Sequence, residues 1–253
     1  MRILRSMALI LILVILVAAI AGAIAYVSLN RRNFALPEAK AALISDDLVT
    51  VSEPDDQDWF VFTPTQVTPD AGFIIYPGGF VEAAAYAPIA RDIAEQGYQV
   101  IIDPMPLNLA VLGIEGADSI IASFPEISSW AIGGHSLGGA MASEFTARNP
   151  ESIDGLALWA AYPGSSTNLS GLPLEAVSIY GDADGVASIA DVRDGAARLP
   201  ESTNFVLIPG GNHTQFGWYG EGLQRGDNPA GISRAEQQRI IVDGTLGMLS
   251  QID

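Results

Sequence analysis

Short apolar segments alternate with segments of helical periodicity along most of this chain. The clearest apolar segments are "FIIY", "SWAIGG" and "LALWAA", and stretches such as "EAAAYAPIARDIAEQG" separate them. Strands that are apolar on both faces are typical of parallel sheets with helices on both sides. The sequence therefore predicts one α/β domain over residues 48–253, with a mostly parallel sheet and helices on both faces.

The first and last parts of this domain are also marked in the sequence. "LVTVSE" and "DWFVFTP" predict an initial strand pair, and "LEAVSIYG" and "TNFVLIPGG" predict further buried strands near the end. The closing helix is expected to begin after Ser233, where Glu236 three residues later would complete a capping box.

A long apolar segment precedes the domain. Met7 to Leu29 carries no charged residue, and as a helix it would rise about 35 Å, enough to cross a bilayer core of about 30 Å. Residues 1–32 are therefore expected to form an N-terminal transmembrane helix, and residues 33–47 a linker. The alternative is a cleaved signal peptide, with small residues at 21–23 or 23–25. The apolar run continues beyond both sites, which favours an uncleaved anchor.

Charge and composition argue against several classes of function. The formal net charge of −17 argues against nucleic-acid binding and against electrostatic adhesion to anionic lipid. No cysteine and only two histidines are present, so neither a metal site nor any other cofactor is expected. An acidic, cysteine-free domain that follows an apolar segment with Arg2 and Arg5 at its start is expected to lie outside the cytoplasm. It would be membrane-anchored or, after cleavage, secreted. The oligomeric state stays open.

The segment "GHSLG" around Ser136 has the G-x-S-x-G pattern and falls between an apolar strand and a helix. In that context the pattern is typical of a nucleophile elbow, where a strained turn presents the serine at the end of the sheet. Ser136 is therefore the candidate nucleophile. His135 beside it is expected to point away and to be packed and hydrogen-bonded.

The base and the acid are sought downstream, because the chain order in this architecture is Ser, acid, His. His213 follows the last strand on a glycine-rich loop and is the candidate base. Asp182 and Asp184 both follow the preceding strand, and Asp184 is favoured because a turn there can direct its side chain to the site. Asp103, after "YQVII", is a third candidate.

A carbonyl substrate needs two backbone N–H donors for its developing oxyanion. Leu137, directly after the nucleophile, is expected to supply one. The other is expected from the loop "PGGFVE", where Gly79 and Phe80 are the candidates.

The segments "IIYPGGFVEAAAYAPIARDIAEQGYQVIIDPMPLNLAVL", "GGHSLGGAMA", "IYGDADG" and "GGNHTQFG" occur in that order. Together they resemble the alpha/beta-hydrolase fold, specifically the dienelactone-hydrolase-like group called alpha/beta hydrolase family 5, over residues 48–250. The resemblance implies Ser136 as nucleophile, His213 as base and Asp184 as acid, the last position of a G-x-x-D stretch. Many relatives have a His-Gly pair before the oxyanion loop where this chain has Pro77-Gly78, so the choice between Gly79 and Phe80 stays open. Dienelactone hydrolase activity is not implied, because its nucleophile is a cysteine.

These features predict a serine hydrolase that cleaves carboxylic esters of a small-molecule acyl substrate through an acyl-enzyme. An acyltransferase, a thioesterase or an amidase would use the same triad, and a non-catalytic binding protein of this fold is the remaining alternative. Only about a dozen residues separate "LALWAAYP" from "LEAVSIYG", so no large lid domain is expected there. The open site would then be lined by apolar residues, of which the candidates are Phe80, Met105, Leu107, Leu109, Tyr162 and Phe216.

Overall fold

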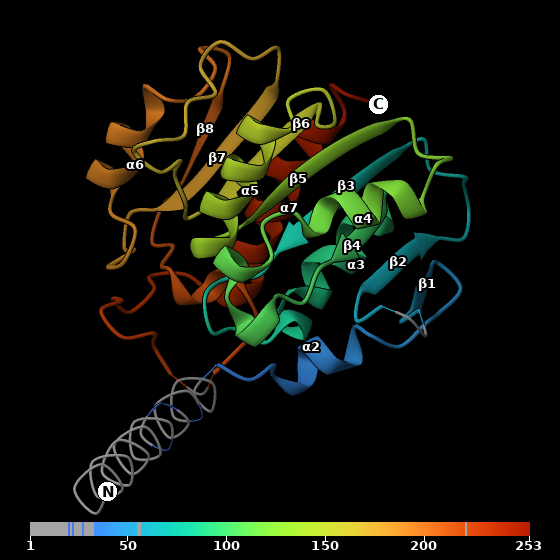
Figure 1. Ribbon diagram of the computed structural model, residues 1–253. Helices are drawn as coiled ribbons and strands as arrows, with labels where there is room; N and C mark the ends of the chain where they lie inside the picture. Colours follow the sequence, from blue (N-terminus) through green and yellow to red (C-terminus); the bar gives the residue numbers. More distant parts are fainter. Residues whose placement is uncertain (1–19, 21, 23–26, 28–32, 55–56, 221) are drawn as a thin grey trace, which may run out of the picture.

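The computed structural model describes residues 20, 22, 27, 33–54, 57–220 and 222–253. An eight-stranded sheet runs through the domain in the order β1-β2-β4-β3-β5-β6-β7-β8 (Figure 1). The strands are β1 (Val49–Ser52), β2 (Phe60–Pro64), β3 (Ala71–Tyr76), β4 (Gln99–Ile102), β5 (Ser129–His135), β6 (Gly155–Trp159), β7 (Glu175–Gly181) and β8 (Asn204–Ile208). Strands β3 to β8 are parallel, and β1 and β2 form the predicted antiparallel pair at one edge.

Along the chain, helices alternate with most of the strands. The α-helices are α2 (Pro37–Ala41), α3 (Ala87–Ala94), α4 (Gly116–Ser123), α5 (Leu137–Arg148), α6 (Ile189–Ala196) and α7 (Arg234–Leu249). Short 3₁₀ turns are η1 (Ala83–Tyr86), η2 (Pro106–Asn108), η3 (Ala110–Leu112) and η4 (Thr214–Phe216). Between β6 and β7, residues 160–174 contain neither a helix nor a strand, so no lid domain stands there.

Two apolar layers hold the sheet between its helices. On β3, Phe73 and Ile75 belong to the layer shared with α3 and α7, whereas Ile74 and Tyr76 belong to the layer shared with α4 and α5. This alternation follows from the two-residue period of a strand. The predicted α/β architecture, with a mostly parallel sheet covered on both faces, is confirmed.

Strand β8 differs from its prediction as a buried strand. Phe205 is 41% exposed and Leu207 43% exposed. Since β8 is the last strand in the sheet order, it has no strand beyond it and only part of its surface is covered. An apolar sequence therefore indicated a strand here without indicating its position in the sheet.

The helix ends also differ in one detail from expectation. Ser233 caps α7 by accepting a hydrogen bond from the Glu236 N–H, but the reciprocal bond of a capping box is not formed. A complete capping box is instead found at α6, between Ser188 and Asp191.

Residues 33–47, for which the sequence predicts a linker, pack on the domain. This stretch contains α2 and buries Ala35 and Ala39 against the domain. The predicted anchor at residues 1–32 lies outside the described residues except for three isolated positions. Among the residues that the structure describes, no helix combines the length and apolar character needed to cross a bilayer.

Candidate active site

Ser136 occupies the turn between β5 and α5, with a backbone conformation of φ 53° and ψ −120°. A positive φ is uncommon for a residue with a side chain and marks the strain expected of a nucleophile elbow. The two glycines of the motif are required by β3, the neighbouring strand. A Cβ on Gly134 or Gly138 would lie 2.2 or 2.0 Å from the Tyr76 carbonyl oxygen.

His213 and Asp184 come together at the carboxyl edge of the sheet, on the loops after β8 and β7. Nδ1 of His213 lies 2.8 Å from Oδ2 of Asp184, and both side chains are fully buried. The other carboxylate oxygen, Oδ1, accepts hydrogen bonds from the N–H groups of Val186 and Ala187. These bonds hold the carboxylate in place beside the His213 ring.

The second ring nitrogen of His213, Nε2, is buried and has no hydrogen-bond partner among the described residues. The ring centroid lies 4.4 Å from that of His135, the residue adjacent to Ser136. His213 thus presents an unpaired ring nitrogen beside Ser136. No hydrogen bond joins it to Ser136 Oγ in this structure, and such bonds often tighten only when substrate binds.

His135 is packed and hydrogen-bonded, as expected for a residue not directed at the serine hydroxyl. Its Nδ1 lies 2.8 Å from Tyr86 Oη, and the ring stacks on Phe216. Tyr86 Oη also accepts a hydrogen bond from the Gly78 N–H. Burial, together with the nearby His213 ring, holds the pKa of His135 well below its usual value. His135 is therefore neutral and joins the elbow, through Tyr86, to the loop of Gly78.

The three candidate oxyanion donors are placed differently. Leu137 begins α5, where the first N–H groups have no intrahelical acceptor. Gly79 lies against it, since a Cβ on Gly79 would be 3.2 Å from Leu137 Cδ2. Among the described residues, the Gly79 N–H forms no hydrogen bond, whereas the Phe80 N–H donates to the Asn108 carbonyl at 2.7 Å. Leu137 and Gly79 therefore have amides available to a substrate oxygen, and Phe80 does not.

The two other candidate acids lie elsewhere. Asp182 is exposed and accepts a hydrogen bond from the Gly210 N–H. Asp103 is buried at the end of β4 against Gly116, where a Cβ would lie 2.1 Å from its Oδ2. Burial raises the pKa of Asp103 to about 7. Neither carboxylate contacts His213.

Asp227 is a structural residue of the site that sequence reasoning missed. Its carboxylate accepts hydrogen bonds from the N–H groups of Gly185, His213 and Thr214 and from the Thr214 hydroxyl. It thereby joins the loop of Asp184 to the loop of His213. No motif spacing identifies it, because it lies beyond the last strand in an irregular segment, "RGDNP".

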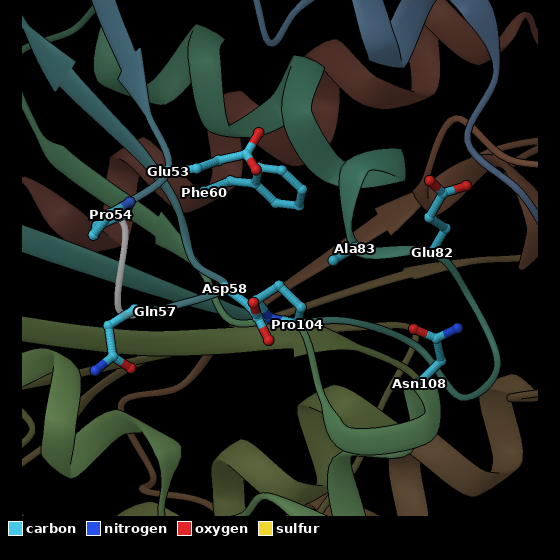
Figure 2. A pocket seen from close by; sticks show the side chains of 9 residues that line it. All are labelled: Glu53, Pro54, Gln57, Asp58, Phe60, Glu82, Ala83, Pro104 and Asn108. Atoms are coloured by element: carbon cyan, nitrogen blue, oxygen red, sulfur yellow. The ribbon is translucent and has the colours of Figure 1, made fainter.

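The residues expected to line the site are divided between core and surface. Met105 and Phe216 are buried, and Leu107 is exposed, while Phe80, Leu109 and Tyr162 are half-buried. A pocket of about 540 Å³ opens next to this region, between β2 and the loops after β3 and β4. Figure 2 shows Glu82 and Asn108 on one side of it and Glu53 and Phe60 on the other. With Asp58 it has three carboxylates, a lining that repels anionic groups.

Comparison with known proteins agrees with this architecture. The model of a family described as "Alpha/beta hydrolase family" matches residues 72–239. A crystal structure described as a predicted CIB-like hydrolase from Thermoplasma acidophilum is similar, with a TM-score of 0.59 and 15% sequence identity over 77% of this chain and 97% of that chain. At that identity the likeness is one of fold. No curated protein matches the sequence.

Proposed function

Since the chain belongs to the alpha/beta hydrolase family, we propose that it is a serine hydrolase that cleaves carboxylic esters. One observation carries the proposal. His213 has one ring nitrogen on the Asp184 carboxylate and the other buried and unpaired beside the Ser136 elbow. An imidazole held in this tautomer is what a serine needs as its general base.

In the proposed reaction Ser136 Oγ attacks the ester carbonyl carbon while His213 Nε2 accepts the hydroxyl proton. The N–H groups of Leu137 and Gly79 stabilise the negative charge on the carbonyl oxygen. His213 then gives the proton to the departing alcohol, leaving an acyl group on Ser136. Water, activated by the same nitrogen, attacks the acyl-enzyme and releases the acid. Asp184 stays ionised and stabilises the imidazolium that forms in each half.

A fluorophosphonate probe tests the mechanism, because it reacts covalently with an activated serine. The protein should be labelled, and Ser136→Ala should abolish labelling. Ser166→Ala removes the hydroxyl of an exposed serine and serves as the matched control, for which labelling should persist. Equal labelling of Ser136→Ala would refute the assignment, and absence of labelling in every form would favour a non-catalytic binding protein.

The same residues could transfer the acyl group to another acceptor or cleave a thioester or an amide. p-Nitrophenyl esters of graded chain length, compared with matched thioesters and anilides, would separate these reactions by their relative kcat/KM. An acceptor alcohol in the assay would reveal acyl transfer by the product formed.

We extend the proposal to location: residues 1–32 anchor the protein in a membrane with the catalytic domain outside the cytoplasm. The support is the uncharged segment from Met7 to Leu29. N-terminal sequencing of the mature protein tests this. A start near Ile24 or Tyr26 would show cleavage and a secreted enzyme instead.

A further inference from the structure

The chain enters the domain directly beside the candidate active site. The Asn33 carbonyl accepts a hydrogen bond from the Glu82 N–H, and the Phe34 carbonyl accepts one from the Gly220 N–H. Leu36 in turn donates to the Trp218 carbonyl. Glu82 follows the loop of Gly79, and residues 218–220 follow the loop of His213. The entry point is therefore hydrogen-bonded to the segments that follow the Gly79 loop and the His213 loop.

Exposed apolar side chains lie on the loops that follow β4 and β8 and on the entering segment that is bonded to Gly220. They form what we call the rim surface, which consists of Phe34, Leu107, Val111, Leu112 and Leu223. Leu107 and Asn108 both have positive φ angles, 55° and 54°, and Leu107 is nevertheless 58% exposed. A strained turn that presents leucine to solvent is costly without a partner, which indicates a functional surface.

Hydrogen bonds connect the rim surface to the reacting groups. The turn that carries Leu107 is bonded to the oxyanion loop, because the Phe80 N–H donates to the Asn108 carbonyl. Leu223 precedes Gln224, whose N–H donates to the hydroxyl of Thr214, the neighbour of His213. The rim surface and the candidate site thus belong to one set of loops.

We propose that the rim surface rests on the lipid bilayer and that the site takes its acyl substrate from the lipid phase. The short distance between the apolar N-terminal segment and the domain supports a bilayer as the partner of the rim surface. The apolar segment ends at Leu29, and the four residue steps from there to Asn33 span at most about 14 Å. A domain tethered this closely, at this edge, has its carboxyl edge towards the membrane. The first half of this proposal rests on the membrane anchor, and the second half on the hydrolase function, both proposed above.

The charge of the protein indicates how such a contact is made. The formal net charge of −17, and the carboxylates of Glu53, Asp58 and Glu82 around the neighbouring pocket, argue against attraction to anionic headgroups. Insertion of apolar side chains into the interface is independent of such attraction. The contact is therefore expected on zwitterionic lipid and should be insensitive to salt.

Cysteine labelling of the full-length chain tests the contact, because the natural sequence has no cysteine. Leu112→Cys places a fluorophore on the rim surface. Val67→Cys is the matched control, since Val67 is 53% exposed and Leu112 54% exposed, and Val67 packs against Gly97 near the opposite end of β4. Each protein is reconstituted into phosphatidylcholine vesicles with and without nitroxide-bearing phosphatidylcholine.

The expected result is quenching of the Leu112→Cys label severalfold greater than that of the Val67→Cys label, unchanged by salt. Equal quenching of both labels would overturn the proposal. Quenching of neither label, as expected if the chain does not associate with lipid, would overturn it as well. A surface that docks on a protein gives no quenching with lipid alone.

The origin of the substrate is tested in the same vesicles with a long-chain ester at varying mole fraction. At fixed bulk concentration, the rate should follow the mole fraction of ester in the bilayer, and a rate set by bulk concentration alone would contradict uptake from lipid. Fluorophosphonate labelling of Ser136 in these samples separates the two proposals. Selective quenching without labelling would refute the hydrolase function and support the membrane contact. Labelling without selective quenching would support the hydrolase function and refute the membrane contact.

Discussion

The hydroxyl of Tyr86 lies 2.8 Å from Nδ1 of His135, within a fully buried pair. The same hydroxyl accepts the Gly78 N–H, so one oxygen connects the nucleophile elbow with the loop that carries Gly79. A shift of this loop would move the Gly79 amide relative to the carbonyl oxygen that it is proposed to bind. Tyr86 is thus a positioning residue, acting through His135 and Gly78.

Tyr86→Phe should lower kcat about tenfold, with little change in KM. The substitution leaves the Gly78 N–H and His135 Nδ1 buried without this partner, at a cost of about 1–3 kcal/mol in stability. Tyr98→Phe is the control, since Tyr98 is buried but forms no hydrogen bond within the described part of the chain. Kinetics of ester hydrolysis and thermal unfolding provide the measurement. Equal kinetic behaviour of the two variants would show that the bond does not position the loop.

Asp184→Asn should reduce kcat by about 10³ to 10⁴, because an amide stabilises the wrong imidazole tautomer. Asp182→Asn changes the exposed neighbour, which bonds Gly210 and not His213, and should cost less than tenfold. Steady-state kinetics with a p-nitrophenyl ester measures both. A larger loss in Asp182→Asn would assign the acid to the other position.

Asp103→Asn should stabilise the protein above neutral pH. Burial raises the pKa of Asp103 in the folded protein to about 7 from its ordinary value of 3.8. The stability associated with its protonated form is therefore present below pH 3.8 and lost as pH rises through about 7. Removing the titration should raise the free energy of unfolding at pH 8 by on the order of 3 kcal/mol, with little effect at pH 4.

The measurement is denaturant unfolding of wild type and variant at both pH values. The difference in unfolding free energy between the two proteins isolates the contribution of Asp103, because both proteins contain His135. The lowered pKa of His135 makes stability rise with pH, opposite to the effect of Asp103. An exposed carboxylate, Asp194, provides the control substitution Asp194→Asn. A gain that is the same at pH 4 and pH 8 would point to packing instead of charge.

Gly138→Ala should destabilise the fold by about 3 kcal/mol or more, because a Cβ there would overlap the Tyr76 and Pro77 carbonyl oxygens, which are backbone atoms without room to move. Gly171→Ala adds the same methyl group where no atom lies within 4 Å and should be nearly neutral. Soluble yield and thermal unfolding decide between these outcomes. A Gly138→Ala protein as stable as wild type would mean that the elbow can relax away from β3.

Much of the fold could be predicted because its determinants are local. The apolar segments that became β3, β5 and β6 are continuous in sequence, and helical periodicity separates them. The position of β8 could not be predicted, since an apolar strand has the same composition at the centre of a sheet as at its edge. Exposure of Phe205 and Leu207 depends on which elements lie next to them.

The sequence by itself determined the α/β alternation, the elbow around Ser136 and the chain order of Ser136, Asp184 and His213, because motif spacing and strand ends are encoded by neighbouring residues. Only the tertiary structure decided which amides are available, since the Phe80 N–H is bonded to Asn108, 28 residues away. Only the tertiary structure likewise decided the bonds of Tyr86 to His135 and of Asp227 to the loop of His213. Such contacts join segments distant in the chain, and their partners are defined only when the sheet brings those segments to one edge.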